Sequence, residues 1–272
     1  MTEHTLPIAV NCSIMFTEFP LLQRASAAKS VGYDAVEFWW PFPTATPSER
    51  DIDEFIKSIE SAGANLIGLN FAAGDMPSGD RGLVSWPGRE AEFRNSVTVA
   101  IRIAERLGTK AFNALYGNRI HGIDPSVQDD LAVVNLAWAA REVAAIGAIV
   151  LLEPVSGALH YPLRTAADVI SVITRMHEQG VDNIKLLADL YHLSVNGDDV
   201  PAAIKNYGTQ IGHVQVADAP GRHEPGTGEL DLLGYLSAIV ATGYRGYAAL
   251  EYAPTTTTSS GLGTFDLSVA ID

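Results

Sequence analysis

Short runs of β-branched and aliphatic residues alternate with longer amphipathic segments along nearly the whole chain. The short runs predict strands at residues 8–13, 34–39, 65–70, 110–116, 148–153, 184–189, 211–217 and 247–252. The longer segments predict helices near residues 20–32, 48–63, 88–108, 126–147, 165–180, 198–207 and 230–242. Several of these helices run into a glycine that can form a left-handed C-terminal cap: Gly32, Gly63, Gly108, Gly147, Gly180 and Gly243. Such regular switching between two patterns is typical of an α/β domain with a parallel sheet.

The number of repeated units selects among the α/β folds. Eight strand-and-helix units in about 250 residues are typical of a (β/α)8 barrel. A doubly wound sheet usually has fewer strands and a glycine-rich first turn, but here the first strand is followed by Asn11-Cys12-Ser13-Ile14-Met15. No Pro/Ser-rich linker divides the chain, and the low-complexity stretch at residues 255–260 follows the last strand. We therefore predict an α/β protein with one (β/α)8 TIM-barrel domain over residues 1–272.

Composition and charge limit the partners. A 47% hydrophobic and 18% charged composition is ordinary for a globular protein and excludes disorder. A formal net charge of -14 disfavours nucleic acid and anionic membranes as partners. No apolar run approaches the roughly 20 residues of a membrane-spanning helix, and the single cysteine, Cys12, fits a reducing compartment. We expect a cytoplasmic homo-oligomer that acts on a small molecule.

Polar residues end the last four predicted strands, where a (β/α)8 barrel places its active site. They are Glu153, Asp189, Gln215 and Glu251. Carboxylates that converge there would repel one another and raise one another's pKa unless a cation neutralised them. An all-oxygen ligand set suits Mg²⁺ or Mn²⁺. The sequence therefore predicts a divalent-metal site at these four residues, with the alternative that each one caps its own strand end through hydrogen bonds to loops.

Several segments also carry a resemblance to a known family. They are residues 16–18, 35–38, 73–75, 81–82, 87–90, 152–154, 189–192 and the glycine- and proline-rich stretch 212–229. In these segments the sequence resembles hydroxypyruvate isomerase, within the xylose isomerase-like barrel superfamily, over about residues 8–263. The resemblance implies an isomerase that interconverts hydroxypyruvate and 2-hydroxy-3-oxopropanoate. It also implies metal ligands at Glu153, Asp189, Gln215 and Glu251, with Glu153 and Glu251 as proton donor and acceptor.

The chemistry of that reaction agrees with this residue set. Moving a carbonyl to the adjacent carbon requires a proton to leave one carbon and another to reach its neighbour, through an enediol. A metal ion that holds both oxygens would stabilise the developing negative charge. Carboxylates on the fifth and eighth strands can face each other across such a site.

Four further residues are predicted to bind substrate. His192 lies where the related sugar epimerases place a substrate-binding histidine, and a loop histidine satisfied by backbone is its alternative. Arg222 could hold the carboxylate of a keto acid in a bidentate way, and an exposed solubilising arginine is the alternative there. Glu37 and Asn70 end the second and third strands and reach the same rim by register, where they would contact the substrate or support the residues that do.

Other features are predicted to be structural, or stay open. We expect His213 and Cys12 to pack in the core. The Trp39-Trp40 pair could wall an apolar side of the pocket or form a subunit interface.

Four other functions compete with the hydroxypyruvate reaction. A 2-oxotetronate isomerase or a ketose 3-epimerase would use the same metal and carboxylates, and pocket size would separate them. A DNA-repair endonuclease of the same superfamily would need several histidines and a less acidic surface. An inactive binding protein is disfavoured because all four predicted ligands are present.

Overall fold

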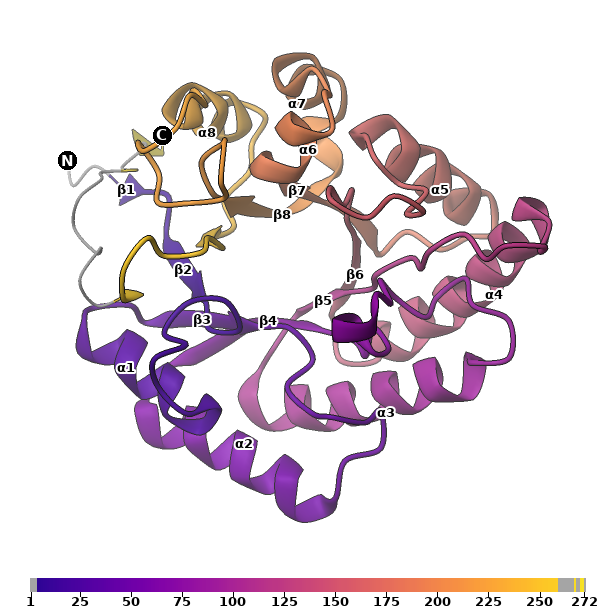
Figure 1. Cartoon of the computed structure of the whole chain (residues 1–272), viewed down its shortest axis with the longest axis horizontal. Helices are drawn as coiled ribbons and strands as arrows, with labels where there is room; N and C mark the ends of the chain where they lie inside the picture. The colour runs from indigo at the N-terminus through magenta and orange to yellow at the C-terminus, as the bar shows by residue number, and fades with distance from the viewer. Residues whose placement is uncertain (1–3, 259–266, 268–269, 272) are drawn as a thin grey trace.

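The computed structural model describes residues 4–258, 267 and 270–271 of the chain. Within these residues, eight parallel strands close into a barrel, which Figure 1 shows end-on. They are β2 (Ile8–Asn11), β3 (Ala35–Phe38), β4 (Asn65–Asn70), β5 (Ala111–Asn113), β6 (Ile149–Leu152), β7 (Ile184–Asp189), β8 (Ile211–Val216) and β9 (Ala248–Leu250). Each strand pairs with the next one in sequence, and β9 pairs with β2. The predicted (β/α)8 barrel is confirmed.

Helices surround the barrel in an outer ring (Figure 1). They are α1 (Arg24–Ser30), α2 (Glu49–Ala62), α3 (Glu90–Leu107), α4 (Pro125–Ala144), α5 (Ala166–Glu178), α6 (Leu190–Val195), α7 (Val200–Tyr207) and α8 (Leu232–Ala241). Short 3-10 turns cover Leu21–Gln23 (η1), Met76–Ser78 (η2) and Gly208–Gln210 (η3). Capping boxes at Ser48 and Thr165 start α2 and α5, since each side chain accepts a backbone N–H of the first turn. All six glycines predicted to end helices have a positive φ.

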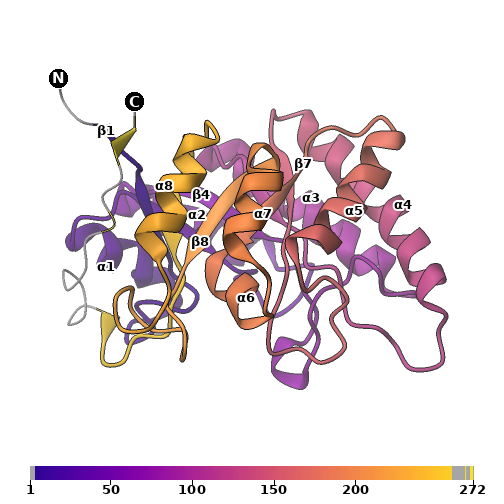
Figure 2. The same cartoon turned by 90° about the horizontal axis from the view of Figure 1, so that it is seen from above.

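The structure adds elements that the hydrophobic pattern did not predict. Helix α6 begins directly after β7, where we expected a loop. An antiparallel pair, β1 (His4–Thr5) with β10 (Ala270–Ile271), joins two segments near the chain ends. Figure 2 shows β1 at one end of the barrel and α6 at the other. No helix within the described ranges has both the length and the apolar character needed to cross a bilayer.

The barrel interior changes from small apolar to polar side chains along the strands. Ala9, Ala35 and Ala249 form a fully buried cluster inside it. Two residues further along each strand come Asn11, Glu37 and Glu251, which share the inward direction because strand side chains alternate. The C-terminal end of the barrel is therefore closed by a buried polar layer that rests on alanine.

Candidate functional site

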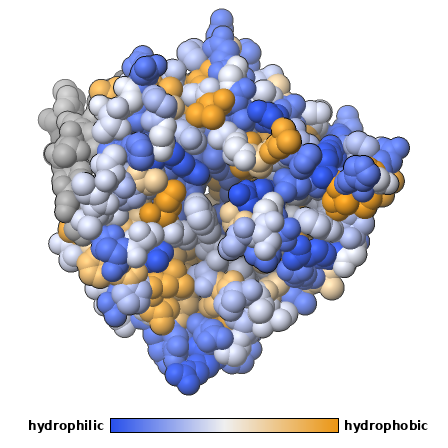
Figure 3. Space-filling view, in the orientation of Figure 1, coloured by the Kyte–Doolittle hydropathy of each residue, from blue (hydrophilic) through white to orange (hydrophobic). Residues whose placement is uncertain are grey.

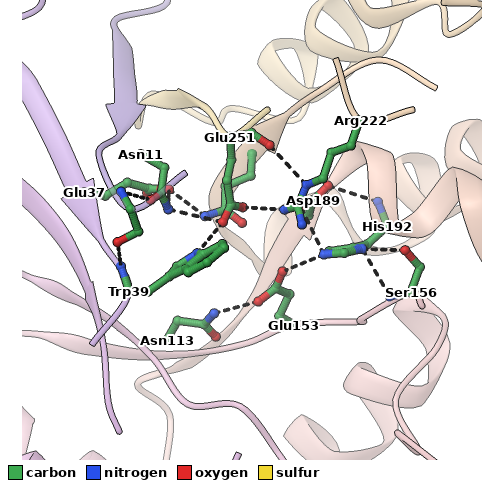
Figure 4. Close-up of polar contacts among 12 residues, drawn as sticks. Asn11, Glu37, Trp39, Asn113, Glu153, Ser156, Asp189, His192, Arg222 and Glu251 are labelled. Atoms are coloured by element: carbon green, nitrogen blue, oxygen red, sulfur yellow. Dashed lines mark hydrogen bonds and ion pairs between the residues drawn. The ribbon is translucent and has the colours of Figure 1, made fainter. Parts of the chain in front are cut away.

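Three carboxylates meet at the C-terminal end of the barrel (Figure 4). Glu153 and Glu251 directly follow β6 and β9, and Asp189 ends β7. All three are buried, with 5%, 2% and 1% exposure. Arg222 and His192 connect them, and the predicted convergence of these three residues is confirmed.

Arg222 joins two of these carboxylates. Its Nη2 lies 3.1 Å from Asp189 Oδ2 and 3.0 Å from Glu251 Oε2, and its Nε donates to the backbone oxygen of Glu251 at 3.2 Å. The guanidinium also stands over the ring of Tyr191, 5.4 Å from its centroid. The side chain is only 19% exposed. Arg222 is thus part of the site, and the alternative of an exposed solubilising arginine is excluded.

The loop after β8 holds Arg222 in place. Asp218 accepts the backbone N–H groups of Ala219, Gly226 and Leu230, at 2.8, 2.8 and 3.1 Å. Arg222 itself has a φ of 58°, a left-handed conformation that costs a non-glycine residue energy. Such strain persists where the surrounding structure imposes it, often at a functional residue. The loop therefore determines where the guanidinium lies.

The ring of His192 lies close to Asp189 and Glu153. Its Nε2 lies 3.6 Å from Asp189 Oδ2 and 3.7 Å from Glu153 Oε1. On the other side of the ring, Nδ1 lies 3.1 Å from the backbone N of Ser156 and 2.7 Å from its Oγ. A backbone N–H can only donate, so Nδ1 is an acceptor and the proton of the neutral ring is on Nε2. Burial lowers the pKa of His192 to about 4, so the ring is neutral at physiological pH.

Gln215 and Glu37 are hydrogen-bonded to each other within the buried polar layer. Gln215 Nε2 donates to Glu37 Oε1 at 2.6 Å, and Asn11 Nδ2 donates to the same oxygen at 2.9 Å. His213 Nε2 lies 2.6 Å from Glu37 Oε2. Asn11 also donates to Glu251 at 3.2 Å, which links this group to the carboxylates. His213 is buried as predicted, but it contacts Glu37 as well as packing.

Burial and mutual repulsion dominate the electrostatics. Burial and the charge of Asp189 raise the pKa of Glu153 to about 8, although a hydrogen bond from Asn113 at 2.6 Å opposes the shift. The pKa of Glu251 is raised well above its usual value, mainly by burial and despite the nearby Arg222. Burial alone would lower the pKa of Arg222, but the charges of Glu251 and Asp189 raise it. A cation would relieve this repulsion.

The residues present fit a bound metal ion. Glu153, Asp189 and His192 bring polar side-chain atoms within 4.8 Å of one another, and the two carboxylates of this buried cluster could hold a metal while His192 Nε2 keeps its proton. Across the part of the chain that the structure describes, Gln215 Oε1 is buried and has no hydrogen-bond partner. Since its Nε2 is committed to Glu37, that oxygen is the end of the amide available to a cation. Carboxylate and amide oxygens are the donors that hard divalent ions prefer.

A pocket of about 850 Å³ opens between the segments that follow β3 and β4, and it adjoins the site through its wall residue Trp39. Trp39 and Trp40 line it, as the pocket-wall alternative expects, and the subunit-interface alternative stays a prediction. Trp39 Nε1 also donates to Glu251 Oε1 at 2.5 Å. Asn70 lines both this pocket and a small gap beside Glu37 and Gln215, so the pocket borders the polar layer. Figure 3 shows this face of the molecule hollowed near its centre.

Several residues of the site were missed by sequence reasoning. Asn11 and Asn113 end β2 and β5, so the register argument used for the carboxylates could have found them. Ser156 lies in a loop, and the sequence carries no signal for its contact with His192. The sequence allows Trp39 as a pocket wall, but it does not predict the hydrogen bond of Trp39 to Glu251. Cys12 is buried, as predicted.

A family model, curated relatives and a solved structure are all similar to this chain over most of its length. The family model of a xylose isomerase-like TIM barrel matches residues 25–265. A putative hydroxypyruvate isomerase of Streptomyces coelicolor is 49% identical, with 90% of each chain covered. The hydroxypyruvate isomerase of Escherichia coli is 32% identical, covering 96% of this chain and 98% of its own. The 2-oxo-tetronate isomerase of Cupriavidus necator is 34% identical, covering 94% and 95%. A crystal structure of an AP endonuclease, family 2, from Brucella melitensis has a TM-score of 0.84 at 31% identity, covering 94% and 96%.

Proposed function

This chain belongs to the xylose isomerase-like TIM barrel family and is an isomerase, and from that premise we propose that it interconverts hydroxypyruvate and 2-hydroxy-3-oxopropanoate. The observation that carries the proposal is the meeting of Glu153 and Glu251 around Asp189, each with a raised pKa. A pKa of about 8, as at Glu153, lets a carboxyl group accept and return a proton at physiological pH, and burial raises the pKa of Glu251 in the same direction.

The reaction moves the carbonyl from C2 to C3 of the same molecule. One of the two glutamates removes a proton from C3 of hydroxypyruvate, which gives an enediolate. The other delivers a proton to C2, and the hydroxyl proton passes from the oxygen on C3 to the oxygen on C2. Two protons are moved and none is gained or lost, so no redox cofactor is required.

Glu153, Asp189, Gln215 and Glu251 are the proposed ligands of a divalent cation, Mg²⁺ or Mn²⁺. When bound, such an ion would polarise the carbonyl and offset the negative charge that develops on the substrate oxygens. Arg222 already contacts two of these carboxylates and supplies positive charge at the same place.

The remaining polar residues orient the substrate. His192 presents its Nε2–H beside Glu153 and Asp189, so it donates to a substrate oxygen instead of ligating a metal through that nitrogen. Arg222 and Asn70 are the other proposed substrate contacts. Glu37, which accepts from Asn11 and Gln215 and is 3% exposed, acts by positioning those two amides.

A 2-oxotetronate isomerase is the second candidate. The pocket of about 850 Å³ is in the range that encloses ligands far larger than a three-carbon acid, so a four-carbon acid is accommodated. An endonuclease is disfavoured, because the site is built on carboxylates and amides and the chain carries a net charge of -14.

The deciding experiment compares turnover of hydroxypyruvate, 2-oxotetronate and fructose by the protein loaded with Mn²⁺ or Mg²⁺. We expect carbonyl migration in a keto acid at a rate well above that with fructose. If the neutral sugar is the better substrate, the protein is a ketose epimerase and the keto-acid proposal is wrong.

A further inference from the structure

The pocket beside the carboxylates contains two arginines with different surroundings. Arg89 is fully engaged, because it forms ion pairs with Asp80 at 2.6 Å and with Glu92 at 2.7 Å. Arg81 has no carboxylate of the described residues within 4.0 Å. It donates only to the backbone oxygens of Met76, at 3.0 Å, and Asp80, at 2.6 Å. Both bonds use Nη1, so Nε and Nη2 are left for another partner.

The backbone around Arg81 is fixed by a close approach to the next loop. Gly82 has a φ of 114° and forms an isolated bridge with Tyr116. A Cβ at this position would stand 2.0 Å from the backbone oxygen of Leu115. Gly82 N also donates to Ala73 O at 2.9 Å. Arg81 therefore precedes a residue that cannot shift without disturbing two segments. The two hydrogen bonds of Nη1 also hold the guanidinium, so binding a ligand costs less side-chain entropy.

We propose that Arg81 binds the carboxylate of the substrate, an inference that rests on the function proposed above. A substrate carboxylate placed between Glu153, Asp189 and Glu251 would meet three groups of its own charge. Arg222 is already in contact with two of them. Arg81 offers a cation without such competition, and guanidinium binds carboxylate in a bidentate way.

In the proposed arrangement a short acid points from the carboxylates toward Arg81. Trp39 and Asn70 border the polar layer and line the same pocket as Arg81. The carbonyl end would lie at Glu153 and Glu251, where protons are exchanged, and the acid end at Arg81. A neutral sugar would gain nothing from Arg81, so this residue selects acids over ketoses.

The test measures binding separately from turnover. D-erythronate and erythritol are a four-carbon acid and its uncharged polyol counterpart, and neither has a carbonyl to isomerise. Calorimetry with the Mn²⁺-loaded protein gives their dissociation constants. We expect Arg81→Met to weaken erythronate binding about 10- to 100-fold, the scale of a charge-assisted contact, and to leave erythritol unchanged. Arg81→Lys should fall between the two, because an ammonium keeps the charge and loses the fork.

Controls separate this effect from charge and from misfolding. Arg141→Met removes an exposed arginine of α4 and should bind erythronate as the wild type does. If Arg81→Met does not fold, the comparison is made with Arg81→Lys alone. Unchanged erythronate binding in the Arg81 variants, a larger loss in Arg89→Met, or no erythronate binding by the wild type would each overturn the inference. A wild type that binds erythronate through Arg81 yet isomerises no keto acid overturns the proposed function and keeps the Arg81 assignment.

Discussion

Asp189 uses its two carboxylate oxygens for different tasks. Oδ1 accepts the backbone N–H of His192 at 3.0 Å and so caps α6, while Oδ2 lies 3.1 Å from Arg222. The cap fixes the rotation of the carboxylate, so Oδ2 is held toward the other acids. The same contact places His192 on the first turn of the helix, with its ring between Asp189 and Glu153.

At this scale, the two glutamates proposed to exchange protons can be tested directly. Glu153→Gln and Glu251→Gln keep the shape of the side chain but cannot carry the proton, so turnover should fall at least about 100-fold. Steady-state rates, circular dichroism and bound metal are measured together, with Glu142→Gln on the surface of α4 as the control. Near-normal turnover with metal bound would exclude that glutamate as an obligatory proton carrier.

The strand register predicted that the three carboxylates converge, but it could not predict the hydrogen bonds and ion pairs around them. Glu153, Asp189 and Glu251 were found because side chains at the ends of parallel strands share a rim. The tautomer of His192 depends on Ser156, which is 36 residues away in a loop whose conformation the sequence pattern does not encode. The ion pairs of Arg222 depend in the same way on the loop after β8.

Two strand pairs around the site have irregular registers. The register of β3 against β4 shifts between Val36 and Glu37, and that of β7 against β8 shifts between Leu186 and Leu187. Such irregularities change the direction of a side chain near a site. They leave no hydrophobic signal, and α6 was missed because a six-residue helix that starts at the strand end shows too little periodicity. Long strands and helices were predictable, and these local departures were not.

Gly82 provides a prediction for the loop after β4. Gly82→Ala should destabilise the protein by at least about 2 kcal/mol, because it adds a clash with Leu115 to an unfavourable φ. Gly79→Ala is the matched control: its φ is 110° and no atom lies within 4 Å of an added Cβ, so it should cost only about 1–2 kcal/mol. Urea unfolding measures both, and equal losses would show that the approach to Leu115 does not constrain the loop.

At the scale of the whole molecule, the buried carboxylates predict that a divalent cation stabilises the fold. Mn²⁺ at 100 times its dissociation constant would add about 2.7 kcal/mol, and a chelator would remove both this gain and the activity. Asp189→Asn keeps a good helix cap but loses the charge, so Mn²⁺ should no longer raise its melting temperature. Asp199→Asn makes the same change at the cap of α7 and should respond as the wild type does. A wild type indifferent to Mn²⁺ would contradict the metal site. The homo-oligomer also stays a prediction, for light scattering to test.

The closure of the barrel between β2 and β9 has a consequence for synthesis. Asn11 and Glu251 are 240 positions apart in sequence and 3.2 Å apart in the site. Asn11 is synthesised long before β9, so a nascent chain cannot assemble the site until β9 has emerged and taken its place beside β2. Fragments that stop before β9 would leave β2, which carries Asn11, at an open sheet edge, without the carboxylate that completes the polar layer. Catalysis thus begins only after the last strand of the barrel is made.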